Sequence, residues 1–108
     1  MSSYQVVFSP ESQEQIADLY RYIEAASSPQ IALDYTDALL RFCEGMEVFP
    51  ERGTPRDDIR YGLRTTNYRG SAIIAYVILG DIVHILGIYY GGQDYESLLL
   101  SWLINIKI

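Results

Sequence analysis

Two long apolar runs in the second half of the sequence constrain the fold most. Residues 71–79 read SAIIAYVIL and residues 81–90 read DIVHILGIYY, with Gly80-Asp81 as a two-residue hairpin turn between their apolar parts. A strand with one exposed face alternates apolar and polar residues, whereas these two are almost continuously apolar over 72–79 and 82–90. Such runs are expected when both faces of a strand are covered. The sequence therefore predicts a β-hairpin covered on both faces.

The first half of the sequence supplies the cover for one of these faces. YQVVF (4–8) has the β-branched and aromatic composition of a strand. Ser9-Pro10-Glu11 and Ser28-Pro29 are helix start signals, with a capping serine before a proline. Apolar residues at helical spacing then predict one helix to about Ala26 and a second that ends near Pro50. Two helices joined by two or three residues run antiparallel.

LRTTNY (63–68) reads as a further strand, so the predicted order is β-α-α-β-β-β. This order favours an α+β domain in which a helical hairpin packs on one face of an antiparallel sheet. A length of 108 residues suits a single domain, 1–108. Its last twelve residues, 97–108, form an apolar extension that is too short to span a bilayer. A closing helical turn, a strand, packing over the second sheet face and self-association to a homo-oligomer are all open for this tail.

Composition excludes several kinds of function. The net charge of −6 argues against direct binding to DNA or to an anionic membrane. One cysteine and one histidine provide neither an internal disulfide nor a convincing metal site, so we expect no metal and no cofactor. The single cysteine fits a reducing compartment and no signal peptide is evident, so we expect a cytoplasmic protein.

The basic residues gather in one stretch of this acidic chain. Five of the eight fall between residues 52 and 69, around the sequence RDDIRYGLR at 56–64. The four-residue spacing suggests a helix face, but Gly53, Pro55 and Gly62 interrupt it, so we expect one turn that starts at Thr54-Pro55. Two interpretations remain open. The arginines pair with nearby acids to order a loop, or they line a surface that contacts an anionic or protein target.

The chain resembles the ParE toxins of the RelE/ParE superfamily, in which a bacterial type II toxin is neutralised by an antitoxin. DLYRYI (18–23), FCEGMEVFPERG, RDDIRYGLR, the YRGSAIIAYVI strand and the closing YYGGQDYESLL carry the resemblance over about residues 4–99. It implies the fold predicted above and a ParD-like antitoxin that wraps the helical hairpin and the sheet. It also implies inhibition of DNA gyrase by binding, without catalysis.

On this interpretation the residues divide into two sets. Target contacts are predicted at Arg60, Arg64, Arg69, Tyr89, Tyr90 and Asp94. Antitoxin contacts are predicted at Leu19, Tyr20, Ile23, Tyr35, Tyr76 and Ile78.

The sequence departs from the family pattern near its last strand. Where ParE-like relatives commonly carry arginines and a histidine, this chain has Gly87, Tyr90, Gly92 and Gln93, while Gly91 and Asp94 keep the pattern. RNA cleavage needs a base, an acid and cations near the phosphate, and the lone His84 lies in an apolar strand. No catalytic residue is therefore predicted. The alternatives to a gyrase inhibitor are a RelE-type ribosome-dependent mRNA endonuclease and a non-toxic antitoxin-binding remnant.

Overall fold

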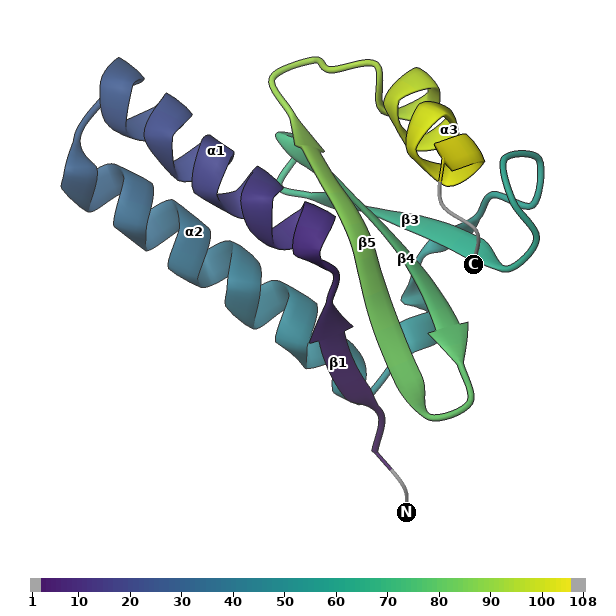
Figure 1. Ribbon diagram of the computed structural model, residues 1–108. Helices are drawn as coiled ribbons and strands as arrows, with labels where there is room; N and C mark the ends of the chain where they lie inside the picture. Colours follow the sequence, from purple (N-terminus) through teal and green to yellow (C-terminus); the bar gives the residue numbers. More distant parts are fainter. Residues whose placement is uncertain (1–2, 106–108) are drawn as a thin grey trace.

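The computed structural model describes residues 3–105, with side chains described for residues 3–101. Figure 1 shows a long helical hairpin beside a twisted sheet, with a short C-terminal helix on the other side of the sheet. The elements are β1 (Gln5–Phe8), α1 (Pro10–Ala26), α2 (Pro29–Glu44), the 3-10 helices η1 (Gly45–Glu47) and η2 (Pro50–Arg52), β2 (Thr54–Pro55), β3 (Leu63–Tyr68), β4 (Ala72–Leu79), β5 (Ile82–Tyr90) and α3 (Tyr95–Asn105).

Both long helices begin at the predicted serine caps. The Ser9 hydroxyl accepts a hydrogen bond from the Ser12 backbone N–H at 3.1 Å, and the Ser28 hydroxyl accepts one from the Ile31 N–H at 3.2 Å. Each cap satisfies a backbone donor that the first helical turn leaves unpaired. The second helix ends at Glu44, earlier than the predicted limit near Pro50, because the chain tightens into η1 and then breaks before η2.

The sheet is mixed, and the prediction of a wholly antiparallel sheet was wrong in one strand. Its order is β1-β5-β4-β3-β2, and every pair is antiparallel except β1 with β5, which run parallel. Gln5 of β1 aligns with Ile82 of β5, 77 positions later in the chain. The antiparallel α1–α2 hairpin separates β1 from the other strands in sequence, so β1 joins the free edge of the last strand. Local periodicity identifies a strand but does not identify its partner.

The arginine-bearing segment forms an edge strand where the predicted turn was to start, and the single turn follows it, with the Arg60 N–H donating to the Arg56 backbone oxygen at 3.2 Å. Thr54 and Pro55 form β2, which pairs with Thr65 and Arg64 of β3. Proline suits an edge strand because its missing N–H is not needed there. The turn that follows is closed by the Asp57 carboxylate, which accepts a hydrogen bond from the Gly62 N–H at 2.8 Å.

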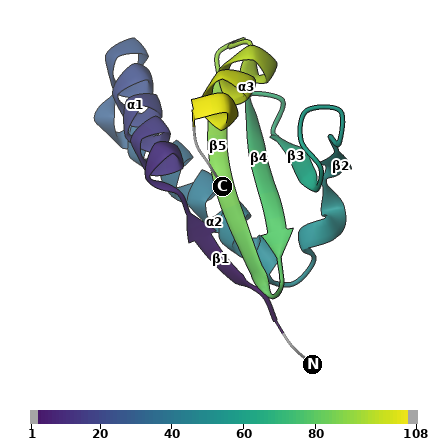
Figure 2. The same cartoon turned by 45° about the vertical axis from the view of Figure 1, so that its right-hand side comes forward.

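Two separate apolar clusters lie on the two faces of the sheet. The helical hairpin covers one face, where Leu19, Leu39 and Cys43 pack against buried residues of β4 and β5. The other face is covered in part by α3, whose Leu99 is fully buried against Leu63 and other apolar residues of β3, β4 and β5. In Figure 2, α3 lies over the upper ends of β5 and β4, with the helical hairpin to their left. The chain's own C-terminal segment thus supplies part of the second cover that the apolar strands required.

Candidate functional site

Two of the clustered arginines hold the loop between α2 and β3 in place. Arg64 donates hydrogen bonds to the backbone oxygens of Glu51 and Gly53, at 3.1 and 3.0 Å. Arg52 donates to the backbone oxygens of Phe49 and Gly45, at 2.9 and 3.0 Å. Because a guanidinium has several donors in a fixed plane, it can satisfy several carbonyls at once. In this conformation Nε and Nη2 of Arg52 and Nη1 of Arg64 are engaged by their own chain.

Arg56 links this loop to α3. Its guanidinium donates to the Asp58 carboxylate at 2.9 and 2.8 Å, to the Tyr95 hydroxyl at 2.5 Å, and to the Glu96 carboxylate. It also lies 5.8 Å from the centre of the Tyr95 ring. The hydrogen bond from Arg56 lowers the pKa of Asp58, while the hydrogen bonds to Asp58 and then Glu96 raise the pKa of Arg56. We call Arg56, Asp58, Tyr95 and Glu96 the Arg56 clasp.

The two remaining arginines of the predicted target surface differ in exposure. Arg60 is half-buried, and its Nη1 is buried without a hydrogen-bond partner among the described residues. Arg69 is exposed in the turn between β3 and β4, where its guanidinium lies 5.0 Å from the centre of the Tyr68 ring. Its backbone has a φ of 53°, a left-handed conformation that tight turns impose. Arg69 therefore presents its charge to solvent from a fixed turn.

The other predicted target residues lie at the end of β5 and in the loop after it. Tyr89 is buried, and its phenol folds back over Gly87 into the space that a Cβ there would occupy. Tyr90 is half-buried, with its ring centre 5.5 Å from that of Tyr22. Burial raises the pKa of both tyrosines above the ordinary value of 10.0. Asp94 caps α3, accepting hydrogen bonds from the backbone N–H of Ser97 at 3.3 Å and from its hydroxyl at 2.9 Å.

A groove of 290 Å³ lies where the outer half of the hairpin meets two turns of the sheet. Three of the predicted antitoxin contacts line it, Leu19, Ile23 and Tyr35, together with Tyr90 from the predicted target set. We call it the end groove. Its lining residues are Leu19, Tyr22, Ile23, Tyr35, Gly70, Ser71, Tyr90, Gly91 and Gly92.

The end groove combines an apolar base with phenol groups at its rim. The Tyr35 hydroxyl lies 2.6 Å from the Ser71 hydroxyl and forms a hydrogen bond that joins α2 to the β3–β4 turn. None of the lining residues is charged. Tyrosines of this kind bury apolar area while their hydroxyls keep a hydrogen-bond partner, which is a property of protein-binding surfaces. The groove is chemically suited to one large apolar side chain of a peptide.

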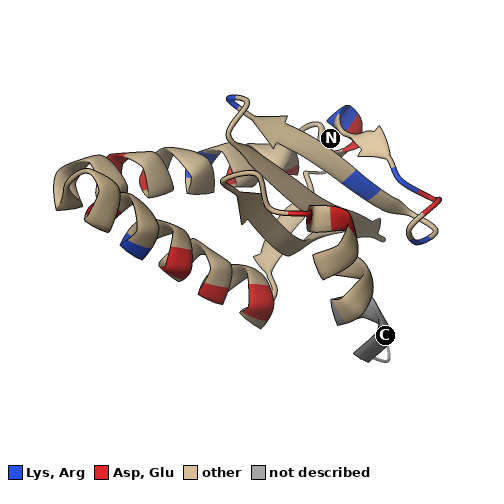
Figure 3. Ribbon diagram, turned by 90° about the horizontal axis from the view of Figure 1, so that it is seen from above, with Lys and Arg blue, Asp and Glu red and all other residues tan. Residues whose placement is uncertain are grey.

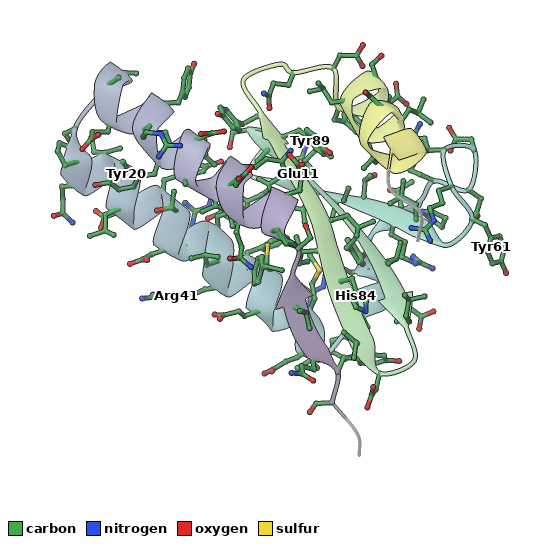
Figure 4. All side chains as sticks on the ribbon, viewed as in Figure 1. Glu11, Tyr20, Arg41, Tyr61, His84 and Tyr89 are labelled. Carbon is green, nitrogen blue, oxygen red and sulfur yellow. The ribbon has the colours of Figure 1, made fainter. Side chains whose placement is uncertain are left out.

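The other three predicted antitoxin contacts lie elsewhere. Tyr20 is half-buried on α1, and Ile78 is half-buried where it packs beside the hairpin cluster (Figure 4 labels Tyr20). Tyr76 is fully buried. Its hydroxyl accepts a hydrogen bond from the Gly53 N–H at 3.0 Å and donates one to the Pro50 oxygen at 2.7 Å. Tyr76 is a core residue and presents no surface to a partner.

Sequence reasoning missed Tyr22 and the glycine turns of the groove. Tyr22 lies three residues after Leu19 on the same face of α1, a spacing that could have identified it. Gly70, Gly91 and Gly92 have φ values of 70°, 64° and 77° in turns that approach each other only in the folded chain. Gly91 and Gly92 thus contribute to the lining of the groove.

Among the remaining candidate groups, the single histidine of the chain lies within the sheet. His84 is half-buried on β5 between Val7 of β1 and Val77 of β4 (Figure 4). Among residues 3–105 no group of three His, Cys, Asp or Glu side chains could hold a metal ion. No helix in that range is long and apolar enough to cross a membrane.

The comparisons with known proteins agree with this fold. The family model described as "ParE toxin of type II toxin-antitoxin system, parDE" matches residues 6–95. A solved chain described as "Chromosomal ParDE TA system from P. aeruginosa" has a TM-score of 0.71 and 17% sequence identity, with 82% of this chain and 96% of that chain covered. That likeness shows a shared fold. No curated protein sequence matches the chain significantly. Because the family model covers most of its length, the chain belongs to the ParE toxin family of type II toxin–antitoxin systems.

Proposed function

We propose that this protein is the toxin of a type II pair, that a ParD-like antitoxin neutralises it, and that the free chain inhibits DNA gyrase by binding. The observation that carries the proposal is the family match over residues 6–95. The P. aeruginosa relative is described as a ParDE toxin–antitoxin system, which supports an antitoxin partner for this fold. The proposed place of action is the cytoplasm, where gyrase and its DNA are found.

The proposed antitoxin site is the end groove with the adjoining outer half of the hairpin. The antitoxin places one large apolar side chain against Leu19, Ile23 and Tyr35, and extends along the exposed surface of α1 and α2. That surface carries many of the chain's acidic residues, as Figure 3 shows in red along both helices. An antitoxin segment with basic residues beside its apolar anchor is therefore the complementary partner.

The proposed gyrase contacts are Arg69 and Tyr90, which flank the turns of the end groove. Inhibition by binding is favoured over RNA cleavage for two reasons. Burial raises the pKa values of Tyr89 and Tyr90, so both phenols stay protonated at neutral pH and neither acts as a base. The guanidiniums of Arg52, Arg56 and Arg64 are engaged by the chain's own carbonyls and carboxylates. This leaves few cations to stabilise a charged phosphate intermediate.

The test is a supercoiling assay with purified gyrase, relaxed plasmid and increasing amounts of the free protein. We expect supercoiling to fall, and to recover when a cognate ParD-like antitoxin is added. Arg69→Ala and Tyr90→Ala weaken the inhibition, whereas Arg41→Ala, an exposed arginine on α2 (Figure 4), leaves it unchanged.

Undiminished supercoiling at stoichiometric excess would refute the gyrase target. The same preparation is then added to a translation extract, where cleaved mRNA would indicate a RelE-type endonuclease. If neither activity appears but the antitoxin still binds, the chain is an antitoxin-binding remnant. Binding is measured by calorimetry with the native chain and with Tyr22→Ala, because Tyr22 lines the end groove; Tyr61→Ala, in an exposed loop, is the control.

A further inference from the structure

A second apolar hollow lies at the opposite end of the hairpin from the end groove, where the start of β1 meets the end of α2 (Figure 1). We call it the base hollow. It has a volume of 470 Å³, and its lining residues are Tyr4, Val48, Phe49, Pro50, Glu51 and Arg52. The side chains of Phe49 and Val48 are 70% and 56% exposed. Large apolar side chains that gather at an exposed hollow mark an interaction surface.

The backbone that carries Phe49 is held in place within the chain itself. Arg52 donates a hydrogen bond to the Phe49 backbone oxygen at 2.9 Å, and the Tyr76 hydroxyl donates one to the Pro50 oxygen at 2.7 Å. Pro50 is also buried. A contact residue on an ordered backbone loses little conformational freedom when a partner binds, which favours affinity. Phe49 is therefore exposed and preorganised at the same time.

The surroundings of the base hollow are acidic. Tyr4 joins it to an adjacent hollow, and the acidic residues that line the two are Glu44, Glu47, Glu51 and Asp81. All four are exposed, and within residues 3–101 no basic side chain forms an ion pair with any of them. The one basic residue in the two linings is Arg52, so four carboxylates and one guanidinium leave a net charge of −3.

This chemistry specifies the occupant as a peptide with one large apolar side chain and Lys or Arg beside it. The apolar side chain packs against Phe49 and Val48, and the cations pair with the free carboxylates. A second copy of the chain fits poorly, because its net charge of −6 brings further acids to an acidic surface. The antitoxin of the proposed function has the required combination, since the acidic hairpin already favours basic residues beside an apolar anchor (Figure 3).

The base hollow lies within reach of a segment seated in the end groove. The stretch of α2 from Tyr35 in the end groove to Glu44 beside the base hollow is roughly 14 Å long at 1.5 Å per residue. The ring centre of Tyr68 lies 5.6 Å from that of Tyr35 and 5.1 Å from that of Phe42, so a row of aromatic side chains follows α2 in the same direction. About nine residues of helix, or four of extended chain, span this stretch.

We propose that the base hollow is a second anchor site for the antitoxin, which places there a large apolar side chain flanked by Lys or Arg. This inference rests on the proposed function. One antitoxin segment is then held at both ends of α2. Because the first anchor makes the second contact intramolecular, the affinity of the segment exceeds that of either anchor alone.

Calorimetry with the full chain and the purified cognate ParD-like antitoxin tests this proposal. We expect Phe49→Ala to weaken antitoxin binding by about tenfold or more, the loss typical of a central contact residue. Tyr61→Ala is the matched control, since Tyr61 is 91% exposed and lines neither hollow, and that variant binds as tightly as the native chain. A Phe49→Ala variant that binds equally tightly would overturn the proposal.

The kinetics of association test the role of charge. We expect the double variant Glu44→Gln/Glu47→Gln to associate severalfold more slowly with the antitoxin at low salt, and its association rate to depend less on salt than that of the native chain. An unchanged rate and an unchanged salt dependence would overturn the basic flank of the anchor.

Hydrogen exchange in the native chain covers the case in which Phe49→Ala alters the fold. Slower exchange of residues 46–52 when the antitoxin is added supports the second anchor, and unchanged exchange overturns it. A Phe49→Ala variant that binds the antitoxin normally but no longer inhibits gyrase would assign the base hollow to gyrase and would also overturn the proposal.

Failure of this inference is distinguishable from failure of the proposed function. If the antitoxin does not bind the native chain, the proposed function itself fails. If it binds and Tyr22→Ala in the end groove weakens it, while Phe49→Ala does not, only the second anchor is wrong.

Discussion

Replacing Tyr76 with phenylalanine tests whether its buried hydroxyl holds the α2–β3 loop to the sheet. The Tyr76 side chain is fully buried, and its hydroxyl is the partner of both the Gly53 N–H and the Pro50 oxygen. Phenylalanine keeps the ring but leaves these two backbone groups without that partner. An unsatisfied buried polar group costs about 1–3 kcal/mol, whereas a group that reaches water costs much less.

The structure places the expected loss in the lower part of that range. The hydrogen bond to the Pro50 oxygen is buried, so this oxygen bears the full penalty. The Gly53 N–H is only partly buried and can be hydrated once the hydroxyl is gone. We therefore expect Tyr76→Phe to lower the free energy of unfolding by about 1–2 kcal/mol. The Tyr76 hydroxyl also approaches the backbone of Gly53 closely, because a Cβ at this position would lie 2.5 Å from the hydroxyl.

Urea unfolding followed by circular dichroism measures this change. The midpoint falls while the slope of the free energy against urea stays constant, because the surface exposed on unfolding is nearly the same. Tyr61→Phe is the matched control, since Tyr61 is 91% exposed and its hydroxyl already contacts water. A loss for Tyr76→Phe no larger than the roughly 0.5 kcal/mol typical of surface substitutions would refute the reasoning.

Two further predictions concern alkaline pH and the attachment of α3. Burial raises the pKa of the Cys43 thiol from its ordinary value of 9.0 to about 12, so the folded chain keeps a proton that the unfolded chain releases. The stability that this difference contributes is fully present below pH 9 and is lost as the pH rises toward 12. In urea unfolding, we expect the free energy of unfolding of Cys43→Ala to fall less between about pH 9 and 10 than that of the native chain. Equal losses would contradict this. Arg56→Gln removes the contacts to Tyr95 and Glu96, so hydrogen exchange in α3 becomes faster, while Arg41→Gln leaves it unchanged. Equal protection of α3 in both variants would show that the Arg56 clasp does not hold the helix.

The elements whose signals are local could be predicted from the sequence. Ser9-Pro10 and Ser28-Pro29 fix the starts of α1 and α2 within a few residues, because capping depends on neighbouring backbone groups. The strand pairing could not be predicted completely, since the parallel contact of β1 with β5 depends on the packing of the whole chain. The apolar run that becomes α3 was ambiguous for a different reason. Without a clear period of 2 or 3.6, a short apolar run suits a helix or a strand.

The candidate site was predicted in part for the same reasons. Leu19, Ile23 and Tyr35 follow from the amphipathic faces of the two helices, and all three line the end groove. The sequence did not predict that Arg64 holds the loop between α2 and β3, because its carbonyl partners lie 11 and 13 residues earlier in the chain. From the sequence alone, Gly87 is only a position that lacks the basic residue common in ParE-like relatives. In the fold it leaves the space that the Tyr89 phenol occupies.

The pairing of β1 with β5 sets the order in which the molecule can be completed during synthesis. Gln5 can pair with Ile82 only after the chain has been synthesised through Ile82, 77 positions later. Synthesis of these residues takes on the order of 4–15 s at cellular translation rates. Until then the apolar faces of α1 and α2 lack the strands that cover them. Tyr90 and Gly91 are translated after that, so the end groove is among the last features to form. A partner that recognises the groove therefore distinguishes finished chains from nascent ones.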